Sequence, residues 1–117
     1  MRMQSEIELP YPPSLNTYWR NVRGRTLLSK KGREYRAIVT SLAALSKIRL
    51  GDVPLVVSIE AWMPDRRRRD VDNILKAAID AMQHGGMYDD DSQIVDLRIV
   101  KRGVEKPGKL IVKLAAA

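Results

Sequence analysis

Alternating apolar and polar residues, the pattern of a strand with one buried face, occur in several parts of the chain. The clearest alternation covers residues 55–63, where every second residue is apolar. A shorter one covers 6–9 and ends at prolines, which cannot donate hydrogen bonds to a sheet. Apolar positions alternate again over 95–99 and 110–114 and predict two more strands. Because Pro107-Gly108 predicts a turn between them, we expect these last two strands to pair as a hairpin.

Two other stretches carry apolar residues at helical spacing. The first covers about 30–48, with Ser29 as a plausible N-cap. Its apolar stripe is expected to consist of Tyr35, Ile38, Val39, Leu42 and Leu45. The second covers 71–84 and has a stripe made of Val71, Leu75, Ala78, Ile79 and Met82. Gly85-Gly86 predicts its end, because glycine adopts the left-handed conformation that commonly follows a helix.

These elements follow one another in the order β-α-β-α-β-β. Between the first strand and the first helix, residues 14–29 have the features of an irregular basic loop, within which 25–28 is a candidate short strand. We therefore predict an α+β fold with a mixed β-sheet and two helices. At 117 residues, the chain is long enough for one domain of ordinary size, and we expect that domain to span residues 1–117.

The composition restricts the chemistry. The net charge is +7, which favours association with a polyanion, chiefly nucleic acid. The chain has no cysteine and a single histidine, His84, which excludes thiolate metal sites and argues against a multi-histidine site. A bound metal would therefore be held mainly by oxygen atoms, and Mg²⁺ and Mn²⁺ are the ions that prefer such ligands.

No apolar run approaches the roughly 18 residues needed to span a bilayer. The N-terminus, MRMQSEIELP, is polar and soon reaches prolines, unlike a signal peptide. We therefore expect a cytoplasmic protein with no membrane contact.

The most informative segment is PDRRRRDVDNILK, residues 64–76. Four arginines, Arg66, Arg67, Arg68 and Arg69, precede a predicted helix that begins with two aspartates, Asp70 and Asp72. In the ordinary interpretation these carboxylates only compensate the helix dipole and the arginines are solvated. However, Asp72 and Lys76 are i, i+4 neighbours at an edge of the apolar stripe, where partial desolvation would be costly without a purpose such as metal binding. The alternative there is a simple ion pair.

A second acidic segment, Asp89-Asp90-Asp91, follows the glycine stop. An exposed turn is the simpler interpretation for Asp89 and Asp90, whereas Asp91 is expected immediately before a strand that would aim its side chain. If the preceding helix packs back across the sheet, Asp70, Asp72 and Asp91 would converge. Carboxylates that hold a divalent ion, with arginines beside them for the flanking phosphates, suit phosphodiester hydrolysis.

Three segments of this chain resemble the RusA family of Holliday junction resolvases, which is common in prophages. They are LPYPPSLNTYWR (9–20), MPDRRRRDVDNILKAAIDAM (63–82) and YDDDSQIVDLRIVK (88–101). The resemblance implies a bacterial or phage-encoded homodimer, active in DNA recombination and repair, which makes paired symmetric nicks in four-way DNA junctions. It also implies dependence on Mg²⁺, with Mn²⁺ as an expected substitute.

The resemblance places an acidic, metal-binding triad on Asp70, Asp72 and Asp91 and an essential lysine on Lys76. Together these four are the expected catalytic residues. Asn73 lies inside the same motif and Asn16 inside the N-terminal one. With Arg66, Arg67, Arg68 and Arg69, these two asparagines are the expected DNA-binding residues.

One departure from the family concerns aromatic residues. Some relatives carry them where this chain has Ile79 and Met87, and this chain has no Phe. A role in unstacking the junction centre would then be absent or fall to Tyr88 or Trp62, although packing roles are the simpler interpretation for all four residues. Two alternative functions also stay open: a non-catalytic nucleic-acid-binding module, and a metal-dependent nuclease acting on other branched DNA.

Overall fold

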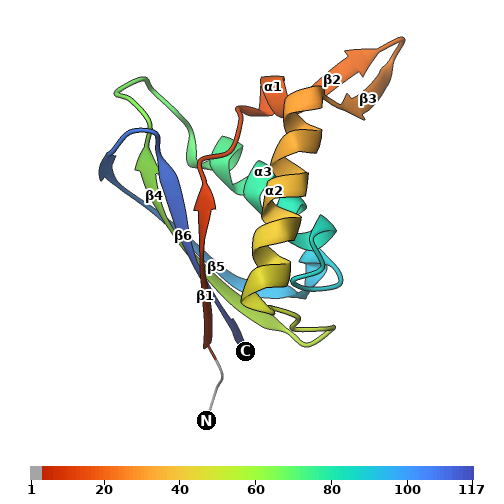
Figure 1. Ribbon diagram of the computed structural model, residues 1–117, viewed down its shortest axis with the longest axis vertical. Coiled ribbons are helices and arrows are strands. Elements are labelled where there is room, and N and C mark those ends of the chain that lie inside the picture. Colours follow the sequence, from red (N-terminus) through yellow and green to blue (C-terminus); the bar gives the residue numbers. More distant parts are fainter. Residues whose placement is uncertain (1–3) are drawn as a thin grey trace.

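A computed structural model describes residues 4–117, and its main feature is a four-stranded mixed sheet covered on one side by two helices (Figure 1). The strand order is β1-β6-β4-β5. The strands are β1 (Gln4–Pro10), β4 (Leu55–Met63), β5 (Ile94–Val104) and β6 (Lys109–Ala116), and the helices are α2 (Lys30–Ser46) and α3 (Val71–His84). The α+β class and the order of these elements confirm the sequence prediction.

The core lies between the sheet and the two helices. All five residues of β4 that alternate from Leu55 to Met63 are buried, as the pattern predicted. Three alternate residues of β6, starting at Leu110, join them. On α3 the buried line contains Ala77, Ala78 and Ala81, whose small side chains allow close packing. Burial of the larger side chains stabilises the fold by about 1.5–3 kcal/mol each.

The predicted hairpin between the last two strands is wrong, because β4 lies between them. β5 pairs with β4 in parallel, and β6 pairs antiparallel with both β4 and β1. Since α3 crosses from the end of β4 to the start of β5, the two strands form a parallel unit. β6 has a fully buried alternating face and occupies an interior position. The turn at Pro107-Gly108 therefore spans the end of β4.

Helix α2 begins after its predicted N-cap, Ser29, and ends at Ser46, two residues before the predicted limit of about 48. The Ser29 hydroxyl accepts a 2.9 Å hydrogen bond from the Gly32 amide, and Lys47 ends the helix in the left-handed conformation. The predicted apolar stripe is correct for Tyr35 and Val39, which are buried, but wrong for Ile38 and Leu45, which are 46% and 80% exposed. At 100° per residue these two lie about 100° or more from the buried line.

Helix α3 occupies the predicted residues, 71–84. The amides of Gly86 and Met87 donate to the carbonyls of Gln83 and Met82, at 3.0 and 3.1 Å, and Gly86 has a φ of +77°. This is the Schellman arrangement that the two glycines predicted. No helix among residues 4–117 is both long enough and apolar enough to cross a membrane.

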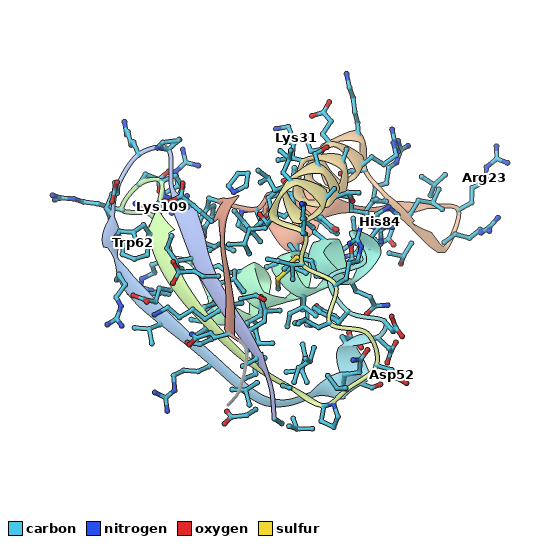
Figure 2. The ribbon with its side chains drawn as sticks, turned by 60° about the horizontal axis from the view of Figure 1, so that its bottom comes forward. Arg23, Lys31, Asp52, Trp62, His84 and Lys109 are labelled. Atoms are coloured by element: carbon cyan, nitrogen blue, oxygen red, sulfur yellow. The ribbon has the colours of Figure 1, made fainter. Side chains whose placement is uncertain are left out.

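The segment expected to be an irregular loop is partly ordered. It contains a one-turn helix, α1 (Leu15–Tyr18), and a hairpin formed by β2 (Trp19–Val22) and β3 (Arg25–Leu28). The short strand at 25–28 was predicted, whereas its partner β2 was not. This hairpin pairs with no strand of the main sheet and projects away from the body of the molecule, with Arg23 at its tip (Figures 1 and 2).

Candidate active site

An open groove of about 540 Å³ runs along the exposed side of α3 and brings together three of the four predicted catalytic residues. Asp72 and Lys76 line it from α3, and Asp91 lines it from the acidic loop. Its apolar walls are Leu75 and Ile79 of α3, Leu97 of β5 and, at one end, Trp19 of β2. Residues separated in the sequence by as many as 78 positions, from Trp19 to Leu97, therefore meet in one concave surface.

Asp72 and Lys76 lie on one face of α3, as their i, i+4 spacing requires. Both side chains are exposed, so the partial desolvation expected from the sequence is not present. Among the ion pairs formed by residues 4–117, none joins Asp72 to Lys76. Both charges are therefore available to a ligand in the groove.

The loop before β5 fixes Asp91 through its backbone. Asp91 was expected immediately before the strand, but it begins a short 3₁₀ helix, Asp91–Gln93, instead. Asp90 caps this helix. The Asp91 amide donates a 2.9 Å hydrogen bond to the Gln83 side chain of α3. Gln93 accepts from the amides of Asp89 and Asp90 and donates to two carbonyls of the loop before β4. This network holds the loop against α3, with Asp91 lining the groove.

Tyr88 and Met87 have packing roles, the simpler of the two interpretations. Both are buried, and the Tyr88 hydroxyl donates a 2.7 Å hydrogen bond to the Ile79 carbonyl. Burial, together with the nearby carboxylates of Asp91, Asp80 and Asp90, raises the pKa of Tyr88. Trp62 lies on the helix-free side of the sheet, where Lys109 sits over its ring at 5.1 Å (Figure 2).

Sequence reasoning missed a second charged cluster at the same groove, formed by Asp80, Arg36 and Tyr18. Arg36 of α2 binds both carboxylate oxygens of Asp80, at 2.8 and 2.9 Å, and the Tyr18 hydroxyl donates to the same carboxylate. Burial and the bond to Asp80 raise the pKa of Tyr18, and the bond to Asp80 raises the pKa of Arg36. Asp80 continues the i, i+4 series of Asp72 and Lys76, a spacing that the sequence displays.

The Asp80 cluster fixes the end of the groove. Arg36 also lies over the Trp19 ring, 5.8 Å from its centre, and Tyr18 meets the same ring edge-on at 5.2 Å. Tyr18 is fully buried, and its carbonyl accepts a 2.9 Å hydrogen bond from the Ser29 amide at the start of α2. Trp19 is therefore held in place by α2 and α3.

Asp70, the fourth predicted catalytic residue, lies outside this groove. It lines a neighbouring depression with Ser14, Asn73 and the arginines Arg67, Arg68 and Arg69. Asp70 occupies the N-cap position of α3, but its side chain makes no capping hydrogen bond. Asp70 has an extended backbone and stands before the first helical turn, and it lines a different depression from Asp72. The exposed Asp70 carboxylate is thus not used as a helix cap.

The arginine run divides into one structural residue and three exposed ones. Arg69 donates a 2.6 Å hydrogen bond to Asp65 and lies over the Tyr11 ring at 5.6 Å. That guanidinium, with the Arg67 amide, lowers the pKa of Asp65 to about 2. Arg66, Arg67 and Arg68 are exposed, and the Arg67 side chain, only 3.9 Å from Asp65, still keeps 84% of its surface accessible.

The two predicted asparagines line two different depressions outside the groove. Asn73 is in the depression that contains Asp70, and Asn16 lines a hollow beneath the β2–β3 hairpin together with Asn21 and Thr26. Trp19 lines both that hollow and the groove. The hollow and the groove are therefore contiguous through Trp19.

The groove has the ligand chemistry for Mg²⁺ or Mn²⁺, which prefer carboxylate oxygen. Among residues 4–117, no three Asp, Glu or His side chains are already arranged around one point as metal ligands. Mg²⁺, however, usually keeps several waters and takes one or two carboxylates together with substrate phosphates. Asp72 and Asp91, which line the same groove, meet this smaller requirement. The residues present therefore fit an ion that binds together with a phosphate substrate.

Comparison with known proteins agrees with this arrangement. The family described as Endodeoxyribonuclease RusA matches residues 10–115. Over 105 residues the chain is 49% identical to the crossover junction endodeoxyribonuclease RusA of Shigella sonnei (strain Ss046), and 48% identical to those of Escherichia coli (strain K12) and Enterobacteria phage 82. Each alignment covers 89% of this chain and 88% of the relative. The chain belongs to the RusA family of endodeoxyribonucleases.

Proposed function

We propose that this protein is a metal-dependent endonuclease that resolves four-way DNA junctions by paired symmetric nicks. The observation that carries the proposal is the groove in which Asp72, Lys76 and Asp91 meet without neutralising one another. The relatives named crossover junction endodeoxyribonuclease support the choice of a branched DNA substrate. Relatives from Escherichia coli and a phage also support a role in DNA recombination and repair in the bacterial cytoplasm.

In this proposal each residue has a defined task. Asp72 and Asp91 would hold Mg²⁺ or Mn²⁺, and Asp70 would add a third carboxylate from the neighbouring depression. An ion held there would supply charge stabilisation at the scissile phosphate and lower the pKa of the attacking water. Lys76 offers a compact positive charge to the same phosphate. Arg66, Arg67 and Arg68 contact the flanking phosphates, with Asn73 and Asn16 as further DNA contacts, whereas Arg69 mainly holds the loop through Asp65.

We also propose that the active form is a homodimer. A four-way junction presents two equivalent strands, and a two-fold symmetric enzyme matches them with one groove for each strand. Sedimentation at micromolar concentration tests this proposal. Only a species of 13.3 kDa, with and without junction DNA, would contradict it.

The direct test is incubation with a synthetic mobile four-way junction and Mg²⁺, beside linear duplex and a replication-fork substrate. We expect paired nicks in the junction, no cleavage of linear duplex, and loss of cleavage when EDTA removes the ion. Binding without cleavage under all metal conditions would favour the non-catalytic module. Equal cleavage of forks and junctions would favour a nuclease with broader specificity for branched DNA.

A further inference from the structure

The β2–β3 hairpin is built like an arm. β2 and β3 pair only with each other, so the hairpin lies apart from the sheet that organises the core. Its residues beyond the first strand position are mostly exposed, including Asn21, the turn residues Arg23 and Gly24, and Arg25 to Leu27. An isolated two-stranded hairpin is marginally stable in water and contributes little to a core. Only the ends of the hairpin, Trp19 and Leu28, pack against the core, so the fold gives no structural reason for the exposed part between them.

The charge of this region is strongly one-sided. Residues 9–33 contain no Asp or Glu and carry six cations: Arg20, Arg23, Arg25, Lys30, Lys31 and Arg33. The net charge of the whole chain is +7, so the rest of the chain is close to neutral. All six cations are exposed, and among residues 4–117 none of them takes part in an ion pair. In contrast, Arg36, Arg69 and Arg102 are paired with carboxylates.

The turn at the tip carries a positive charge at a conformational cost. Arg23 and Gly24 have φ values of +52° and +76°, the two left-handed residues of a two-residue hairpin turn. Asn or Asp is the usual residue before glycine in such a turn, because other side chains adopt a positive φ less readily. An arginine in this position points its guanidinium away from the body of the protein (Figure 2).

The base of the arm is packed against Arg36 and Tyr18 and adjoins the groove. Trp19, the first residue of β2, is held by Arg36 and Tyr18 and lines both the groove and the hollow under the hairpin. The hollow offers the uncharged hydrogen-bonding side chains of Asn16, Asn21 and Thr26. A nucleic-acid strand that leaves the groove past Trp19 would thus meet polar groups and then unpaired cations.

Building on the proposed function, we infer that the β2–β3 hairpin is a second DNA-binding element, separate from the arginine run, which grips the phosphate backbone of a duplex arm leaving the groove. Arg20, Arg23 and Arg25 bind these phosphates. Because linear duplexes and junction arms carry the same phosphate backbone, the hairpin contributes affinity for duplex DNA of any sequence rather than recognition of the branch point.

The test compares three variants with the wild type by fluorescence anisotropy over a salt series. The arm variant combines Arg20→Gln, Arg23→Asn and Arg25→Gln, and a second variant has Arg23→Asn alone. The single change makes the turn Asn-Gly, which favours this hairpin and removes only the charge. The matched control is Lys47→Asn, because Lys47 is the other non-glycine residue with a positive φ among residues 4–117 and lies at the end of α2 far from the hairpin. The α2 helix separates the two sites by about 25 Å.

We expect the arm variant to bind both the junction and linear duplex at least about tenfold more weakly at 0.15 M salt. Its slope of log affinity against log salt should become shallower by about 1 for each arginine that no longer binds a phosphate. Arg23→Asn should show a smaller loss in the same direction with no fall in melting temperature, and Lys47→Asn should bind like wild type.

Two results would overturn the inference alone. The first is an Arg23→Asn or arm variant with wild-type affinity and salt slope, when the wild-type protein binds and cuts junctions. The second is a loss of affinity confined to the junction, which would assign the hairpin to the branch point. A wild-type protein that neither binds nor cuts junctions would instead refute the proposed function itself.

Discussion

The groove along α3 carries acidic groups on elements packed into the fold, whereas the β2–β3 hairpin carries cations on a projection. The acidic groups of the groove stand on a helix packed into the core and on a loop fixed by Gln83 and Gln93. The cations of the hairpin stand on a projection with no core of its own. Chemistry at a scissile bond needs groups placed within a fraction of an ångström, whereas binding to a repeating phosphate backbone tolerates movement. Rigidity is therefore found where a reaction would take place.

The largest expected effect concerns Asp91 in the groove. We expect Asp91→Asn to reduce junction cleavage at least about 10³-fold, roughly 4 kcal/mol of transition-state stabilisation, because the substitution removes the charge that a metal needs. Binding should persist, since the change reduces repulsion of DNA. Nicking and gel-shift assays on one preparation measure both quantities. Asp89→Asn is the matched control, and equal losses in the two variants would remove the special role of Asp91.

Asp70 tests whether the groove extends into the neighbouring depression. We expect Asp70→Asn to lower cleavage at least about 100-fold, a cost of roughly 2.7 kcal/mol, while binding stays intact. Because the Asp70 side chain makes no capping hydrogen bond, the melting temperature should change little. Wild-type cleavage combined with a lower melting temperature would reduce Asp70 to a helix cap.

Lys76 refines the comparison between the groove and the hairpin, because it is a cation that stands on α3, the helix packed into the core. We expect Lys76→Arg to fold and bind the junction like wild type, yet to cut at least tenfold slower, a loss of about 1.4 kcal/mol. Arginine keeps the charge but spreads it over a planar fork that cannot act as a compact donor. Single-turnover cleavage at saturating enzyme measures this step. Full activity would show that any positive charge suffices there.

The smallest effect is expected from the exposed part of the arginine run. Changing Arg66 and Arg67 to Ala should weaken binding of all DNA sequences alike, by about threefold to tenfold, with a shallower salt slope. The cleavage rate of bound junction should stay near that of wild type, because these side chains are exposed to solvent and do not line the groove. An unchanged slope would place them away from the DNA.

The predictable part of the fold was set by short-range patterns. The strand at 55–63 and the helix at 71–84 have the predicted limits, and Ser29 and Gly86 cap their helices as expected. The hairpin strand β2 escaped prediction because four residues with a single aromatic carry no clear alternation. The buried face of α2 was misjudged at Ile38 and Leu45, because only packing against other elements decides which side of a helix is covered.

By itself, the sequence determined which side chains are available: carboxylates in a chain without cysteine, a surplus of cations, and a motif in which Asp72 and Lys76 must share a helical face. Tertiary structure decided which groups meet. It placed β4 between β5 and β6, brought Asp91 to the same groove as Asp72, and left Asp70 in the depression next to it. The physical reason is that capping and periodicity act within a few residues. Strand partners and converging side chains depend on burial shared between distant segments, which no local pattern records.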